Sequence, residues 1–381
     1  MLRRISVYHI RLGFLKGLIG LLLVYSGVCS AGATIKSGAH DGQGVTSLHD
    51  YVFSANQAAH DMSVYRIDPA TGALNELPES PYKTGRFPVS VTISHDGKFA
   101  YVANQGSNTV SGFTLDESKG KIIPIKGSPF PAGKYPDAVV ISQDNRFAYI
   151  TNEDDNSVLS FTIDPDSGAL KKTGATVATG KHPISITIAP NGHFALVSNF
   201  DDATISTYQI NTKTGELKPT GNQVKTGEHP IYISVSPDNR FAYVANYGET
   251  NVSAYQVNTS SGELKELKGS PFSAGAQPYS VIVDPTMHFL YVANWGSHDV
   301  SAFKINHDTG MLTEIKGSPY GADWYPYAVV VDSQSHYAYV ANNGAGNISA
   351  YSIDSKTGAL KEHPNSPFKS DAGPYSMAVG Y

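Results

Sequence analysis

Apolar and polar positions recur along residues 49–381 with a period of 47 or 48 residues. A Tyr-Val-Ala-Asn-like tetrapeptide marks each unit, and its asparagine falls at Asn56, Asn104, Asn152, Asn199, Asn246, Asn294 and Asn342. A proline that opens an apolar run keeps the same phase, at Pro88, Pro136, Pro183, Pro230, Pro278, Pro326 and Pro374. Two markers that stay in phase seven times indicate an internal structural repeat.

Each unit predicts four short strands. The first follows the marker proline as an almost unbroken apolar run, which is typical of a strand covered on both faces. The second ends at the marker asparagine, and the third carries apolar positions around an aromatic, as in Val252, Tyr255 and Val257. A Thr-Gly or Ser-Gly turn, where glycine accepts a positive φ, opens the fourth. Four antiparallel strands per repeat of roughly 40–50 residues predict the blade of a β-propeller.

The two ends of the repeat array are incomplete in complementary ways. The array begins with strands two to four of a blade, about Tyr51 to Leu77, and finishes with a lone first strand, Pro374 to Tyr381. Pairing these segments would remove an open sheet edge. We therefore predict an all-β, seven-bladed propeller over residues 49–381, whose last blade is closed by the N-terminal strands plus the C-terminal strand.

The segment before the repeats has the order of a secretory signal. Four basic residues and no acid lie in residues 1–16, an apolar run covers residues 17–28, and Ala31-Gly32-Ala33 offers small residues for cleavage. This order predicts a signal peptide over residues 1–33 and a linker over residues 34–48. An uncleaved anchor is the alternative, but the run is short for a span of about 20 residues. We expect a periplasmic or secreted protein with no membrane span in the mature chain.

Composition narrows the classes of function. Charged residues make up 16% of the chain, and the only cysteine, Cys29, lies in the predicted signal, so the mature chain has no thiol for disulfides or metals. Removing four bases and no acids moves the formal net charge from −5 to 24 − 33 = −9. An acidic chain without a Lys/Arg run is a poor nucleic-acid binder. We expect a monomer that carries no cofactor.

The Phe-Ala-Tyr-Val-Ala-Asn units and the Thr-Gly-x-Leu turns resemble the lactonase-type seven-bladed propellers, which include 6-phosphogluconolactonases and YVTN-repeat propellers. The resemblance covers nearly all of residues 49–381 and implies the fold. It also implies an active-site motif in which Arg and His follow one marker proline and Asn-Glu ends the next strand. Here no marker proline is followed by Arg or His, whereas Asn-Glu is kept once, as Asn152-Glu153 after Pro136-Asp137-Ala138.

Candidate site residues gather at the loops expected to share one face around the central channel. His182 and His229 precede marker prolines in neighbouring blades and are suited to general-base or metal chemistry, or they are aromatic-sized plugs. An aromatic arc suited to a sugar or peptide ligand comprises Phe200, Tyr247, Trp295, Trp324 and Tyr325. Acidic runs at residues 153–155 and 201–202 match no calcium-loop spacing, so we interpret them as solvated turns and expect no metal.

These observations favour an exported binding module over an enzyme. Its loop-rich face would hold a small molecule, a glycan or a protein partner. The first alternative is a 6-phosphogluconolactonase-like lactone hydrolase, in which Glu153 would be the catalytic base because opening a lactone needs a base and an oxyanion donor. The second alternative is a surface or adhesive structural protein.

Overall fold

The computed structural model describes residues 51–116 and 121–380. The predicted signal peptide, residues 1–33, and the predicted linker, residues 34–48, lie outside the described residues. Within the described part of the chain, no helix is long and apolar enough to cross a membrane.

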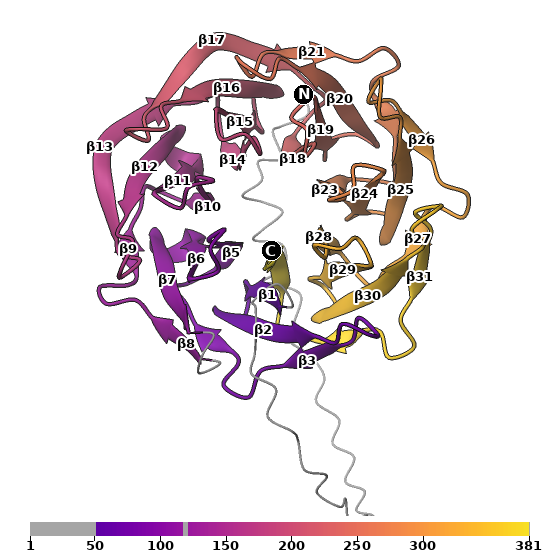
Figure 1. Ribbon diagram of the computed structural model, residues 1–381, viewed down its shortest axis with the longest axis horizontal. Helices are drawn as coiled ribbons and strands as arrows, with labels where there is room; N and C mark the ends of the chain where they lie inside the picture. Colours follow the sequence, from indigo (N-terminus) through magenta and orange to yellow (C-terminus); the bar gives the residue numbers. More distant parts are fainter. Residues whose placement is uncertain (1–50, 117–120, 381) are drawn as a thin grey trace, which may run out of the picture. The chain divides into compact units, whose positions relative to one another are not determined.

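Seven antiparallel sheets form a ring, as predicted (Figure 1). The first strands are β5 (Pro88–Ile93), β10 (Pro136–Ile141), β14 (Pro183–Ile188), β18 (Pro230–Val235), β23 (Pro278–Val283), β28 (Pro326–Val331) and β33 (Pro374–Val379). The second strands are β1 (Tyr51–Asn56), β6 (Phe99–Asn104), β11 (Phe147–Asn152), β15 (Phe194–Asn199), β19 (Phe241–Asn246), β24 (Phe289–Asn294) and β29 (Tyr337–Asn342). Blades are numbered 1 to 7 in the order of their second strands.

The outer half of each blade is built from the third and fourth strands. The third strands are β2 (Asp61–Ile67), β7 (Thr109–Asp116), β12 (Ser157–Ile163), β16 (Thr204–Ile210), β20 (Asn251–Val257), β25 (Asp299–Ile305) and β30 (Asn347–Ile353). The fourth strands are β3 (Leu74–Glu76), β8 (Lys121–Pro124), β13 (Leu170–Ala178), β17 (Leu217–Lys225), β21 (Leu264–Glu266), β26 (Leu312–Glu314) and β31 (Leu360–Glu362). In five blades a second short piece also pairs with the third strand: β4 (Tyr82–Lys83), β9 (Phe130–Pro131), β22 (Phe272–Ser273), β27 (Tyr320–Gly321) and β32 (Phe368–Lys369).

The first strands surround the axis and contact one another in a closed cycle from β5 through β10, β14, β18, β23 and β28 to β33 and back (Figure 1). Apolar clusters fill the spaces between neighbouring sheets, so each blade buries its faces against the next one. This packing explains why the first and second strands read as continuous apolar runs.

The ring closes where the sequence predicts. The strand β33 pairs antiparallel with β1, with Val379 opposite Val52 and Met377 opposite Ser54. On the outer side, the hydroxyl of Tyr65 donates to the carbonyl oxygen of Lys369 at 3.1 Å. Blade 1 is therefore completed by the two ends of the repeat array.

The marker asparagines are structural. In blade 2, Asn104 is fully buried and its Nδ2 donates to Ser111 Oγ at 2.9 Å, which ties the end of the second strand to the third. In blade 3, Oδ1 of Asn152 accepts the backbone N–H of Gly133 at 2.9 Å, and a Cβ on Gly133 would lie 2.5 Å from this side chain. In blades 3 and 4 the asparagine thus also holds the turn that leads into the first strand of its own blade.

Tyrosine hydroxyls join several neighbouring blades. Second-strand tyrosines donate to the carbonyl of the glycine turn in the following blade, as Tyr339 does to Gly72 at 3.0 Å and Tyr243 does to Gly310 at 2.8 Å. Tyr149 occupies the same position in blade 3, but its buried hydroxyl has no hydrogen-bond partner among the described residues. The high tyrosine content of the chain thus has largely a structural origin.

Candidate functional site

The mouth is defined here as the end of the ring where the first strands begin and the second strands end. In all seven blades, the residue after the marker asparagine donates its N–H to the carbonyl of the residue before the marker proline, for example Glu153 to Tyr135 at 2.9 Å and Tyr247 to His229 at 3.0 Å. The residues before the prolines all have positive φ, between 50° and 73°. The repeat thus holds both sets of loop residues together at the mouth.

Three buried polar side chains from blades 2 and 3 meet at the mouth. Gln105, Asp137 and Glu153 are only 3%, 4% and 5% exposed. The amide Nε2 of Gln105 lies 3.3 Å from Oδ2 of Asp137 and 3.3 Å from Oε2 of Glu153. One amide group therefore donates toward both carboxylates, whose oxygens are no more than about 6.6 Å (twice 3.3 Å) apart. We call these three residues the carboxylate site.

Local structure fixes each member of the carboxylate site. Gln105 begins the 3-10 turn η3 (Gln105–Ser107) and Glu153 begins the equivalent turn η4 (Glu153–Asp155), each directly after a second strand. Asp137 follows Pro136 at the start of β10, where the pairing with β11 is irregular between Pro136 and Val139. Both carboxylates thus come from adjacent ends of paired strands in blade 3.

Four tyrosines from the first strands of blades 5, 6, 7 and 1 fill the centre of the ring. The ring centroids of Tyr279 and Tyr327 are 4.4 Å apart, those of Tyr327 and Tyr375 are 4.5 Å apart, and the hydroxyls of Tyr279 and Tyr375 hydrogen bond. Tyr232 lies 6.2 Å from Tyr279. Burial raises the pKa of Tyr232 to about 12, and the negative charge of Asp137 adds to this shift.

The predicted aromatic residues form a chain of ring contacts along the mouth of blades 4 to 7. The Tyr247 ring lies 6.4 Å from Phe200 and 6.0 Å from Trp295, and Trp295 stacks on Tyr325 at 4.6 Å. Phe200 is 6% exposed and stacks against His229 at 4.4 Å, so its own face is covered. The mouth is therefore divided into a carboxylate side and an aromatic side.

Trp324 lies at the outer edge of this arc. It is 63% exposed, its ring is 6.3 Å from Tyr325, and it stacks on His298 at 5.9 Å. The indole Nε1 of Trp295 and the Nδ2 of Asn343 are buried donors without a hydrogen-bond acceptor among the described residues. The aromatic side thus carries polar donors as well as rings.

The two predicted histidines have different neighbours. His182 places Nδ1 2.8 Å from Oδ2 of Asp201, whereas His229 packs on Phe200. Burial raises the pKa of Asp154, and the nearby Glu153 charge raises it further, which indicates a crowded acidic rim. In residues 51–116 and 121–380, no group of three or more His, Cys, Asp or Glu side chains is arranged to hold a metal ion.

Sequence reasoning missed Gln105 and Asp137 as members of the site. A signal for Asp137 was present, because it is the only charged residue that directly follows a marker proline; the others are Val89, Ile184, Ile231, Tyr279, Tyr327 and Tyr375. One position further on, serines such as Ser90 and Ser376 accept N–H groups from the neighbouring first strand at 3.3 and 3.4 Å. At these two serines, the position that would hold His in the family's active-site motif instead links two neighbouring first strands through a hydrogen bond.

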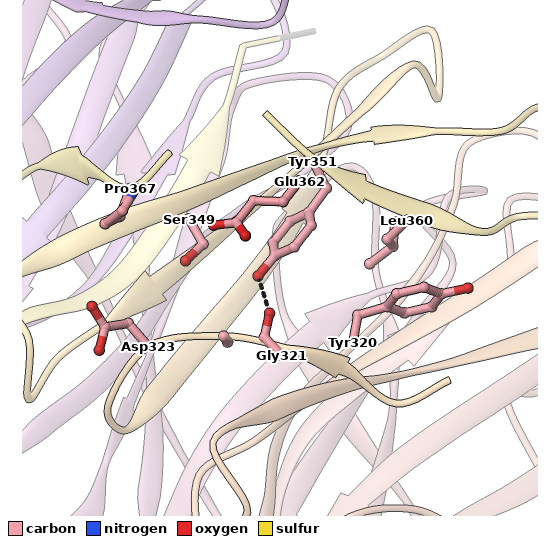
Figure 2. Close-up of a pocket in the computed structure, with 9 residues that line it drawn as sticks. Tyr320, Gly321, Asp323, Ser349, Tyr351, Leu360, Glu362 and Pro367 are labelled. Carbon is pink, nitrogen blue, oxygen red and sulfur yellow. Dashed lines mark hydrogen bonds between the residues drawn. The ribbon is translucent and has the colours of Figure 1, made fainter. Parts of the chain in front are cut away.

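A cavity of about 380 Å³ lies between blades 6 and 7, on the outer strands rather than at the carboxylate site (Figure 2). Its lining includes Tyr320, Asp323 and Glu362, and the hydroxyl of Tyr351 crosses it to donate to the carbonyl of Gly321 at 2.5 Å. A Cβ on Gly321 would meet nothing within 4 Å, so the missing side chain leaves space here. None of the predicted site residues lines this cavity.

The chain is similar to known seven-bladed propellers in sequence and in structure. A family model described as "Lactonase, 7-bladed beta-propeller" matches residues 44–132, 123–228, 201–278 and 267–373. A solved structure of a candidate 6-phosphogluconolactonase from Bacteroides fragilis is similar, with a TM-score of 0.76 and 21% identity over 86% of this chain and 97% of that one. A periplasmic gluconolactonase from Pseudomonas aeruginosa gives a TM-score of 0.73 and 18% identity over 86% and 99%. No curated protein sequence matches this chain.

Proposed function

The chain belongs to the lactonase family of seven-bladed β-propellers, and on that premise we propose that it hydrolyses a lactone at the mouth. The observation that carries this proposal is the carboxylate site, where Gln105 donates toward Asp137 and Glu153. Buried titratable groups gathered at one place, rather than spread over the surface, are typical of functional sites. The proposal thus favours the enzyme over the binding module that the sequence favoured.

Glu153 has the chemistry of a general base for this reaction. Its carboxylate would take a proton from a water molecule as the water oxygen attacks the lactone carbonyl carbon. The ring C–O bond then breaks, and the departing ring oxygen takes the proton back from Glu153, which leaves a hydroxy acid. Gln105 would hold the carboxylate in place, because its amide cannot rotate without losing two hydrogen bonds.

A hydroxyl donor for the developing oxyanion is offered by Tyr232, one of the four first-strand tyrosines. With a pKa raised to about 12, Tyr232 stays protonated at neutral pH and can donate a hydrogen bond. Its position near Asp137 puts this hydroxyl in the same central region as the carboxylate site. Tyr232 thus takes the place, in chemical terms, of the cation that the family motif would supply.

The aromatic side would hold the body of the substrate. Tyr247 and Trp295 offer ring faces and the Trp295 Nε1–H a donor, a combination that suits a hydroxylated ring. The same surface supports the second candidate function, a binding module that holds a sugar-like ligand without turnover. The two candidates differ only in whether the bound ring reacts.

Acid release from δ-lactones in a pH-stat tests the proposal. We expect wild-type protein to exceed the spontaneous rate, and Glu153→Gln to lower kcat by about 10²–10⁴-fold. Asp155→Asn is the matched control, because Asp155 lies in the same turn but is exposed and should leave turnover unchanged. Wild-type turnover no faster than the spontaneous reaction, together with ligand binding by calorimetry, would instead support the binding module.

We also propose that the protein is exported. The basic, apolar and small-residue order of residues 1–33 supports this. Mass spectrometry of protein from its native host should find a new N-terminus between about Ser30 and Thr34. An intact Met1 in a cytosolic fraction would contradict export and would leave the proposed chemistry unaffected.

A further inference from the structure

We propose that Trp324 forms a second sugar-binding subsite beside the mouth, so that the preferred substrate is a lactone that carries a further sugar ring. The inference rests on the proposed function, because it takes the reacting lactone to lie at the mouth. It concerns the size of the substrate, whereas the proposed function concerns the reaction.

Trp324 is the one aromatic residue at its position of the repeat. The position lies two residues before the marker proline, and in blades 1 to 6 it holds Ala372, Arg86, Lys134, Lys181, Glu228 and Ala276. The backbone at this position is alike in blades 6 and 7: Gly344 donates its N–H to the Trp324 carbonyl at 3.0 Å, as Gly296 does to that of Ala276 at 2.9 Å. A side chain that departs from the repeat on an unchanged backbone is where a site carried by the scaffold would show.

The Trp324 ring is held in place although it is 63% exposed. It stacks on His298 at 5.9 Å with 18° between the ring planes, and it meets Tyr325 nearly at a right angle at 6.3 Å. Its backbone N–H donates to Oδ1 of Asp323 at 2.8 Å. An exposed ring that its neighbours already order loses little conformational freedom when a ligand stacks on it.

Polar groups lie beside this ring. Nδ1 of His298 accepts the N–H of Tyr325 at 3.2 Å, so the imidazole carries its proton on Nε2 and can donate it. Asp323 accepts Nδ2 of Asn347 at 2.8 Å on Oδ2, and it also lines the cavity between blades 6 and 7 (Figure 2). An aromatic face beside a donor and a carboxylate suits a sugar, whose C–H groups pack on the ring while its hydroxyls hydrogen bond.

An isolated exposed aromatic fits a sugar better than a protein partner. Among the described residues, the other exposed large apolar side chains are Ile123 in blade 2 and Met311, which lies beyond the end of β25 opposite to the mouth. Trp324 therefore belongs to no larger apolar patch, whereas a protein interface buries a core of several apolar residues. A sugar ring needs only one aromatic face.

Tyr325 connects this subsite to the mouth. Its ring centroid lies 4.6 Å from that of Trp295 and 6.3 Å from that of Trp324. The two tryptophans are thus no farther apart than these two distances together, a span that two linked sugar rings cover. With the lactone ring against Trp295, the second ring of the same substrate would stack on Trp324.

The test compares kcat/KM for glucono-δ-lactone with kcat/KM for two disaccharide lactones, cellobiono-δ-lactone and maltobiono-δ-lactone. We expect wild type to prefer at least one disaccharide lactone by about three- to tenfold. Trp324→Ala should remove this preference, mainly through a higher KM because the subsite is remote from the reacting bond, and should change kcat/KM for the monosaccharide lactone by less than about twofold. The variant is expected to fold, since alanine is the natural residue at this position in blades 6 and 1.

Two control variants follow from the repeat. Lys134→Ala removes the exposed side chain at the same position of blade 3 and should leave the preference unchanged. His298→Asn keeps an acceptor for the N–H of Tyr325, because Asn156 accepts the equivalent N–H of blade 4 through Oδ1 at 2.9 Å. It removes the ring on which Trp324 stacks, so it should weaken the preference by about two- to threefold.

Outcomes for the inference and for the proposed function are separable. No preference for either disaccharide lactone in wild type, or a preference that Trp324→Ala leaves unchanged, overturns the inference and leaves lactone hydrolysis standing. If no lactone is turned over, the proposed function fails, and acrylamide quenching of tryptophan fluorescence then compares cellobiose and maltose with glucose. Trp295 is the only other tryptophan of the chain, so Trp324→Phe shows how much of any protection belongs to Trp324. Protection by a disaccharide but not by glucose, lost in Trp324→Phe, supports the subsite; equal protection or none overturns it.

Discussion

Removal of the last strand should destroy the ring. Deleting residues 374–381 takes away β33, whose Met377 and Val379 are 7% and 3% exposed. At about 1.5–3 kcal/mol for each buried apolar side chain, these two contribute roughly 3–6 kcal/mol to the free energy of unfolding. The pairing of β33 with β1 adds backbone hydrogen bonds worth roughly 0.5–1.5 kcal/mol each. A domain is typically stable by about 5–15 kcal/mol, so the loss is comparable with the whole.

Thermal unfolding followed by circular dichroism measures this effect. We expect the truncated protein to aggregate or to melt far below wild type, and an excess of a peptide with the sequence of residues 374–381 to raise its melting temperature by strand addition. Met377→Ala is a milder test, expected to lower the free energy of unfolding by about 2–5 kcal/mol. Lys369→Ala, an exposed change in the neighbouring blade 7, should have little effect. An unchanged melting temperature after truncation would refute closure by β33.

Two further predictions concern stability. Tyr339→Phe should lower the free energy of unfolding by about 1–3 kcal/mol in urea titration, because the buried carbonyl of Gly72 loses its donor. Tyr149→Phe is the matched control and should be neutral or stabilising, since that hydroxyl has no partner among the described residues; equal effects of the two variants would contradict the role of these hydroxyls. The second prediction concerns three turn aspartates, Asp96, Asp144 and Asp238. Burial alone would raise the pKa of each carboxyl, but hydrogen bonds from the serine two residues earlier and from the Lys or Arg two residues later lower it overall. Because their folded-state pKa values lie below the unfolded value near 3.9, their contribution is complete above that pH and is lost as pH falls through the folded values. The melting temperature should therefore drop between about pH 4 and pH 2, and a triple Asp→Asn variant should show a shallower drop over the same range.

The fold was largely predictable because each blade repeats the same strands, turns and marker residues. The marker prolines and asparagines recur for physical reasons, since Asn104 and its equivalents tie strands together and the first strands are covered on both faces. The phase of the repeat alone predicted that the C-terminal strand, β33, belongs to blade 1 and pairs with β1. The short outer pieces such as β27 were not predicted, because two residues after a Ser-Pro turn carry no periodic signal.

The candidate site was less predictable because its members come from different blades. Glu153 stood out through its Asn-Glu context, but Gln105 lies 48 residues earlier and meets it only through the curvature of the ring. Asp137 was visible in the sequence only as the one charged residue that directly follows a marker proline. Phe200 was expected as part of a ligand-facing arc, and its burial beneath His229 depends on a stacking contact between blades that no sequence pattern reveals.

Binding and opening of a lactone at the mouth can be tested with a crystal structure of the Glu153→Gln variant soaked with an uncharged δ-lactone. This variant should bind the ring without opening it. We expect an intact lactone against Tyr247 and Trp295, with its carbonyl carbon facing residue 153 and its oxygens near Tyr232. A lactone bound only in the cavity between blades 6 and 7, or no lactone at the mouth under conditions that saturate turnover by wild type, would contradict hydrolysis at the mouth.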